Sequence, residues 1–277
     1  MTLFLDARLS AVGGNLAAAV GIHQGTAQFL NDIRGRHLLI ATHGFNVDRA
    51  AGIASLSNWE CLLQLPPDTV FLGLLWPGDS IWRHGLDYPE EPRVANDAGR
   101  LVASFLDANF GGAASISFVS HSLGARVILA AISKMHLPVR RAILMAGAID
   151  DDCLSTEFKA AAAKIGRISV LASRQDKVLS SAFPLGNFVA GIITEGHPWW
   201  HAALGQTGPS IPYPNNFQSP FMIPDNWGFE HGDYLQLDPP APSILVPIDI
   251  PANGYPEPGA KYWQAAWTAA LSSTRFR

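Results

Sequence analysis

Hydrophobic residues recur along the chain in short continuous runs, and amphipathic stretches separate them. Five runs have the length and composition of strands buried on both faces, because their apolar residues follow one another instead of alternating. These runs cover residues 38–42, 70–75, 115–119, 142–146 and 168–172. Helical periodicity is visible between them, near residues 49–63, 93–109, 123–134 and 155–164. Strands and helices in alternation predict an α/β fold with a doubly wound, mostly parallel sheet.

The regular pattern ends near residue 183. Residues 183–227 are rich in proline and tryptophan, and insertions of this size in a compact domain commonly form lids or binding loops. We therefore expect a single domain over residues 1–277, with 183–227 as a lid-like or pocket insertion. A helical pattern returns only at 258–272.

The composition is apolar and poor in charge. Hydrophobic residues make up 48% of the chain and charged residues 15%, against about 25% charged in a typical domain. The net charge of −4 and the lack of a basic cluster argue against nucleic acid or an anionic membrane as a partner. The two cysteines, Cys61 and Cys153, are expected as buried free thiols.

Membrane and export signals are not visible in the sequence. No apolar segment reaches the roughly 18 residues that span a bilayer. Asp6 and Arg8 interrupt the apolar residues near the start, so the order of a signal peptide is missing. We therefore expect a soluble, cytoplasmic protein without integral membrane association.

The strongest chemical signal is Ser-His-Ser-Leu-Gly at residues 120–124. A buried strand precedes it and an apolar helix follows it, which is the setting of a nucleophile elbow. Small residues on both sides allow the tight turn that exposes the Ser122 oxygen at the helix N-terminus. Ser120 stands where glycine is usual, and serine is small enough for this turn. The alternative is that Ser122 only caps the helix.

Two backbone N–H groups are candidates for an oxyanion hole. Leu123 directly follows the candidate nucleophile, and Phe45 lies in His-Gly-Phe-Asn at residues 43–46, which ends an earlier strand. Two donors are expected, because removing one costs about 2.7–4 kcal/mol of transition-state stabilisation. Gly44 would allow the close backbone approach. The alternative is an ordinary turn at the end of a strand.

The candidate acid is Asp176, in the loop after the strand at 168–172. A carboxylate there would hold the imidazole of the base in its working tautomer. Asp150, the first residue of the run 150–152, is the alternative acid. A solvated loop or a helix start also explains that acidic run.

The base comes last in the chain order nucleophile, acid, histidine. Of nine histidines, His231 is best placed, because it follows the irregular insertion and Gly232 lets its loop turn. His197 and His201 also follow Asp176 and remain alternatives. The sequence therefore predicts a triad of Ser122, Asp176 and His231.

Four motifs in order resemble a known family. They are His-Gly-Phe-Asn at 43–46, Trp-Pro-Gly-Asp at 76–79, Ser-His-Ser-Leu-Gly at 120–124 and Ser-x-x-Asp at 173–176. The chain resembles an uncharacterised bacterial alpha/beta-hydrolase family with HG(F/Y)N, tryptophan-proline, (A/S)HS(M/L)G and SxxD motifs. The resemblance covers roughly residues 36–235. It implies a serine esterase or lipase-like enzyme with the same triad, and it names no substrate.

Such a triad acts on acyl groups without a metal or cofactor, and no metal-ligand spacing is visible. We expect a small-molecule carboxylic ester as the substrate. Amidase, thioesterase and acyltransferase activities use the same groups. A catalytically silent binding module on the same fold is the alternative from another class. The sequence does not predict the oligomeric state.

The expected substrate pocket contains polar and aromatic residues from three of the motifs: His43, Trp76, Asp79 and His121. Aromatic residues of the insertion either wall this pocket or only pack the insertion against the core. They are Trp199, Trp200, Tyr213, Phe217, Phe221 and Trp227.

Overall fold

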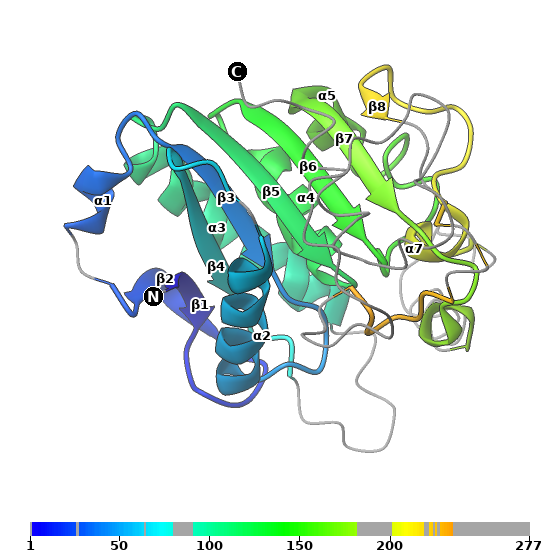
Figure 1. Cartoon of the computed structure of the whole chain (residues 1–277), viewed down its shortest axis with the longest axis horizontal. Coiled ribbons are helices and arrows are strands. Elements are labelled where there is room, and N and C mark those ends of the chain that lie inside the picture. Colours follow the sequence, from blue (N-terminus) through cyan, green and yellow to red (C-terminus); the bar gives the residue numbers. More distant parts are fainter. Residues whose placement is uncertain are drawn as a thin grey trace.

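A computed structural model shows how the chain folds. It describes residues 2–25, 28–63, 65–79, 91–181, 201–218, 222–223, 225 and 228–234. Strands from all along the described chain form one twisted sheet with helices on both faces (Figure 1). The strands are β1 Leu3–Arg8, β2 Leu16–His23, β3 His37–Thr42, β4 Thr69–Leu75, β5 Ser115–His121, β6 Val139–Met145, β7 Ile165–Leu171 and β8 Phe217–Gln218.

The eight strands have the order β2-β1-β4-β3-β5-β6-β7-β8. The pairing of β1 with β2 is antiparallel, and every other neighbouring pair is parallel. The carboxyl ends of β3, β5, β6 and β7 therefore lie at the same edge of the sheet, where parallel α/β folds place their sites. The predicted fold class, an α/β fold with a mostly parallel sheet, is confirmed.

Helices cover the two faces of the sheet unequally. Alternate residues of β4 enter different hydrophobic clusters: Leu72 and Leu74 pack with α3 and α4, whereas Phe71 and Leu75 pack on the other face, the side of α2. Strands buried on both faces explain the continuous apolar runs of the sequence. The helices are α1 Phe29–Asp32, α2 Arg49–Leu62, α3 Glu91–Asn109, α4 Gly124–Lys134, α5 Lys159–Lys164 and α7 Leu204–Thr207.

All five predicted strands and all four predicted helices between them are present, with shifted ends. The strand predicted at 142–146 runs from Val139 to Met145. The helix predicted at 155–164 begins only at Lys159, because the preceding residues form hydrogen-bonded turns.

Three strands, β1, β2 and the two-residue β8, are absent from the sequence prediction. Asp6 and Arg8 lie in β1 yet are only 7% and 3% exposed. Each is paired with an opposite charge, Asp6 with Arg49 and Arg8 with Asp79, which is the condition under which charged side chains are buried. The edge strand β2 is half exposed and rich in alanine, so it lacks a strand's apolar pattern.

The described part of the predicted insertion, residues 201–218, contributes to the sheet and core. Leu204 of α7 is fully buried, and β8 pairs parallel with β7. The remaining residues of 183–227, apart from 222, 223 and 225, and the helix predicted at 258–272 lie outside the described residues. The role of 183–227 as a lid stays a prediction.

Both cysteines are free, and Cys153 is buried as expected. The expectation for Cys61 is wrong: its side chain is exposed, because it lies near the end of α2 on a face turned away from the core. Within the described part of the chain, no helix combines the length and apolarity needed to cross a membrane.

Candidate active site

Ser122 lies at the sharp turn between β5 and α4. Its φ angle is 54°, in the left-handed region that serine rarely adopts. The Ser122 N–H donates to the Met145 carbonyl of β6 at 3.0 Å, which fixes the turn against the neighbouring strand. A Cβ at Gly124 would lie 2.4 Å from the His43 carbonyl oxygen, so only glycine allows α4 to start this close to β3.

The three residues predicted as a triad lie together. His231 Nε2 is 2.9 Å from Ser122 Oγ, and His231 Nδ1 is 2.7 Å from Asp176 Oδ2. The other Asp176 oxygen accepts the Leu179 N–H at 2.9 Å. Asp176 is fully buried, whereas Ser122 is 6% exposed. This arrangement gives His231 one defined partner on each ring nitrogen, as a general base beside a nucleophile requires.

The alternative acid and base occupy other positions. His201 Nδ1 pairs with Asp151 Oδ1 at 3.0 Å, and Asp150 forms a backbone bridge with Ala203. His197 lies outside the described residues. Of the candidate acids and bases in the described part of the chain, His231 contacts Ser122 and Asp176 contacts His231.

The turn at residues 43–46, named here the HGFN turn, is held by its own histidine. His43 Nδ1–H donates to the Gly44 carbonyl at 2.9 Å, and His43 Nε2 accepts the Trp76 N–H at 3.4 Å. The Trp76 ring stacks on His43 at 5.8 Å and donates its Nε1–H to the His43 carbonyl at 2.9 Å. Burial lowers the pKa of His43 to about 4, so this imidazole is neutral near pH 7.

The HGFN turn lies directly beside Ser122, the candidate nucleophile. A Cβ at Gly44 would lie 2.7 Å from Ser122 Cβ and 3.3 Å from Ser122 Oγ. In a trans peptide the carbonyl and the N–H point in opposite directions. The bond from His43 to the Gly44 carbonyl therefore also sets the direction of the Phe45 N–H. The N–H of Leu123, the other predicted donor, belongs to the N-cap residue of α4.

His121, the residue before Ser122, contacts His231, the candidate base. Its Nε2 lies 2.7 Å from the His231 carbonyl oxygen, and the two imidazole rings are 4.8 Å apart. Burial, aided by the nearby His231, lowers the pKa of His121 to about 3. His121 is therefore neutral and carries its proton on Nε2, since a carbonyl can only accept.

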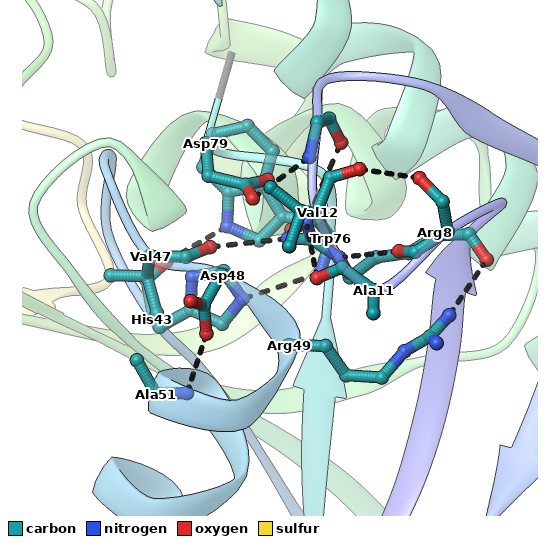
Figure 2. A network of polar contacts seen from close by, with 12 residues as sticks. Arg8, Ala11, Val12, His43, Val47, Asp48, Arg49, Ala51, Trp76 and Asp79 are labelled. Atoms are coloured by element: carbon teal, nitrogen blue, oxygen red, sulfur yellow. Dashed lines mark hydrogen bonds and ion pairs between the residues drawn. The ribbon is translucent and has the colours of Figure 1, made fainter. Parts of the chain in front are cut away.

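Behind the HGFN turn, a buried arginine joins three segments (Figure 2). Arg8 Nη1 donates to the carbonyls of Trp76 at 2.9 Å and Val47 at 3.1 Å. Arg8 Nη2 forms an ion pair with Asp79, whose other oxygen accepts the Gly13 N–H at 2.9 Å. The β1–β2 connection, the residue that follows the HGFN turn and the segment after β4 are thus tied together. Sequence reasoning missed Arg8, although a charged residue in an apolar run is a signal for a buried ion pair.

The predicted pocket residues surround the HGFN turn. His43 and Trp76 are fully buried, and Asp79 and His121 are 8% and 7% exposed. Their assignment to a substrate pocket stays a prediction. Tyr213 contacts Phe217 of β8, with ring centroids 5.2 Å apart. The other four aromatic residues named for the insertion lie outside the described residues.

Within the described part of the chain, one group has the donor set for a metal ion: Asp151, Asp152 and His201, with ligand atoms within 4.8 Å of one another. His201 lies 3.0 Å and 3.7 Å from the two carboxylates. Partial burial lowers the pKa of His201, but the bond to Asp151 and the charge of Asp152 outweigh it and raise the pKa. When His201 is protonated, it neutralises part of this acidic charge.

Weak similarity to solved structures accompanies this geometry. One is a type II thioesterase from the yersiniabactin biosynthetic pathway, with 20% identity over 41% of this chain and 43% of that chain, and a TM-score of 0.30. Another is a lipase-esterase related protein from Clostridium acetobutylicum, with 17% identity over 44% and 46% of the two chains and a TM-score of 0.29. The chain thus spans less than half the length of these two proteins.

A third similar structure is acetyl xylan esterase 1 from Thermoanaerobacterium sp., with 13% identity over 71% of this chain and 70% of that chain, and a TM-score of 0.37. Similarity at these levels assigns no activity. No curated protein matches the sequence.

A family model also matches the chain, and this match identifies the family. Residues 22–191 match the family described as "Alpha/beta hydrolase of unknown function (DUF900)". This range is more than half of the chain and contains β3 to β7, the elbow and Asp176. The protein therefore belongs to this family of alpha/beta hydrolases.

Proposed function

We propose that the protein is a serine hydrolase that cleaves small carboxylic esters through an acyl-enzyme. The observation that carries the proposal is the unbroken hydrogen-bonded line from Ser122 Oγ through His231 to buried Asp176, with separations of 2.9 Å and 2.7 Å. If Ser122 served only as a cap of α4, it would not require hydrogen bonds to His231 and onward to Asp176. The N-cap of α4 makes no side-chain hydrogen bond.

In the proposed reaction, Ser122 Oγ attacks the acyl carbonyl while His231 Nε2 takes its proton. Asp176 stabilises the imidazolium that forms. The N–H groups of Leu123 and Phe45 hold the oxyanion. His231 then gives the proton to the leaving alcohol, and a water molecule, deprotonated by His231, releases the acid and restores Ser122.

The second oxyanion donor is supported by the contacts of the HGFN turn. Gly44 brings the backbone against Ser122 because it has no Cβ, and His43 holds the Gly44 carbonyl. The Phe45 N–H thereby has a fixed direction before any substrate binds, and preorganised donors are what lower the barrier in acyl transfer.

An ester is the proposed substrate because it combines an acyl carbonyl with an alkoxide that His231 can protonate as it leaves. Cleavage of amides or thioesters and acyl transfer to another alcohol would use the same triad and oxyanion donors. Each of these reactions is therefore tested separately. A silent binding module would need neither an activated serine nor an oriented base.

The first experiment is labelling of the purified protein with a fluorophosphonate probe, which reacts with activated serines. Wild type should label one serine per chain, and Ser122→Ala and His231→Ala should abolish labelling. His201→Ala is the matched control, because His201 pairs with Asp151 instead of Asp176, and it should label like wild type. A folded wild type that remains unlabelled would reject the hydrolase and favour the binding module.

Labelling of the wild type would then justify a screen of p-nitrophenyl esters of increasing chain length beside an anilide and a thioester. Asp176→Asn should lower ester hydrolysis on the order of 10⁴-fold, since the base loses its working tautomer. Asp150→Asn, the same change at the alternative acid, should leave the rate unchanged. A larger loss in Asp150→Asn than in Asp176→Asn would overturn the assignment of the acid.

A further inference from the structure

His121 joins the candidate nucleophile to the candidate base, and neither role in the proposed reaction uses its side chain. We infer that His121 is a positioning residue, which sets the distance between His231 and Ser122 through a hydrogen bond to the His231 backbone. The inference rests on the proposed hydrolase function and adds a further residue to its machinery.

The His121 side chain contacts the main chain of His231, the candidate base, and not its imidazole nitrogens. His121 Nε2–H donates to the His231 carbonyl at 2.7 Å, across 110 residues of sequence. His121 and Ser122 are consecutive residues, so the same backbone carries the nucleophile and the donor that holds the base. A shift of the elbow would therefore move Ser122 Oγ and the His231 main chain together.

The surroundings of His121 hold its ring in one position and in the neutral form that donates from Nε2 to the His231 carbonyl. Its Nδ1 faces Gly44, where a Cβ would lie 3.3 Å away, and the Tyr234 ring lies 6.0 Å from its own ring. The ring is buried and neutral, which agrees with its lowered pKa. A neutral ring also places no second positive charge beside His231 when that residue is protonated during the reaction.

A second hydrogen bond holds the other side of the same loop, residues 228–234. Ser173 Oγ–H, just after β7, donates to the Phe229 carbonyl at 2.5 Å. The loop is thus attached to the elbow by His121 and to the acid loop by Ser173. Loops without such attachments are mobile, whereas proton transfer from Ser122 requires His231 within hydrogen-bond reach.

The test compares His121→Met with His121→Gln. The Gln amide nitrogen lies as many bonds from Cβ as the imidazole Nε2, so it can donate to the His231 carbonyl. Met has a similar length and no donor. The measured quantities are the fluorophosphonate labelling rate and kcat and KM for p-nitrophenyl acetate.

We expect His121→Met to lower the labelling rate and kcat on the order of 100-fold, the effect of a misplacement of about 1 Å, with little change in KM. His121→Gln should recover roughly tenfold of that loss, the worth of one hydrogen bond. Ser117→Ala is the control on the same strand, since the buried Ser117 hydroxyl has no hydrogen-bond partner among the described residues, and it should react like wild type.

Thermal unfolding of each variant separates loss of folding from loss of position. A folded His121→Met that reacts like wild type, or a folded His121→Gln that is no faster than His121→Met, would overturn the inference. If His121→Met does not fold, His121→Asn replaces it, because its shorter amide reaches only the Nδ1 position. An unlabelled wild type rejects the proposed function itself and the inference with it.

Discussion

The fold keeps two histidines uncharged: His43, in the HGFN turn, and His121, which precedes Ser122. Each ring is buried and has hydrogen-bond partners that suit only one neutral tautomer. In each of these neutral rings, one nitrogen is a hydrogen-bond donor and the other is an acceptor. Its ability to titrate near pH 7 is suppressed by burial.

This suppression predicts a dependence of stability on pH. The pKa of His43 is lowered to about 4 and that of His121 to about 3, from 6.5. Between these values and pH 6.5 the unfolded chain binds more protons, so the free energy of unfolding falls as the pH falls. The stabilisation is complete above pH 6.5 and is lost toward the folded pKa values. Each histidine contributes a slope of at most about 1.4 kcal/mol per pH unit.

Urea unfolding at several pH values from about 7.5 to about 5 checks this slope. His121→Gln cannot titrate in this range, and its slope should therefore be smaller than that of wild type. Equal slopes in the two proteins would show that His121 is not kept neutral by the fold.

Gly44→Ala tests how closely the HGFN turn approaches the nucleophile. The new Cβ would lie 2.7 Å from Ser122 Cβ, closer than real Cβ contacts, so the turn or the elbow must move. We expect this overpacking to lower the free energy of unfolding by about 1–3 kcal/mol. The rate of fluorophosphonate labelling should fall by a larger proportion than the free energy of unfolding does. Gly111→Ala is the control, because nothing lies within 4 Å of a Cβ there.

The sequence was sufficient to place Ser122, Asp176, His231 and Gly44 at one edge of the sheet. The predicted chemistry requires particular residue types at strand ends, and chain order distinguishes the candidate base from other histidines. The hydrogen bond from His121 to a backbone carbonyl could not be predicted, since any residue offers that carbonyl. Cys61 was mispredicted for a related reason: residue type gives a tendency to be buried, whereas the orientation of α2 decides it.

At the scale of elements, the central strands followed directly from their apolar runs, because strands covered on both faces leave a continuous pattern. The strand β1 could not be recognised in this way. Its charges are compatible with burial only through Asp79 and Arg49, which lie in distant segments. The late start of α5 likewise depends on turns that carry no periodic signal.

Removal of Arg8 should show how much β1 depends on its ion pair. Arg8→Met would leave Asp79 buried without its partner, and we expect the free energy of unfolding to fall by about 3–5 kcal/mol. Arg100→Met is the matched control: Arg100 pairs with Asp97 on α3, but its side chain is 59% exposed, so a change within about 0.5 kcal/mol is expected. Urea unfolding measures both, and equal losses would contradict the importance of the buried pair.

At the scale of the whole molecule, the centre of the sheet is buried, whereas its edge strand β2 is partly exposed to solvent. Strand β5 lies between β3 and β6, and six of its seven residues are buried. No residue of the edge strand β2 is buried. We expect hydrogen exchange to be at least about 100-fold slower in residues 115–121 than in residues 16–23, because central strands open only with global unfolding. Mass spectrometry of the corresponding peptides measures this ratio, and similar rates would contradict the proposed order of protection.

The groups around Ser122 come from chain segments far apart in sequence, and the bond between Ser122 and His231 spans 109 residues. Contacts between such distant segments form late, after local helices and hairpins, since a long loop must close first. We therefore expect probe labelling of Ser122, the candidate nucleophile, to report when folding is complete. During refolding, the helical circular dichroism signal should return before probe labelling does. A protease that cleaves incompletely folded chains would therefore act on chains whose Ser122 does not yet react with the probe.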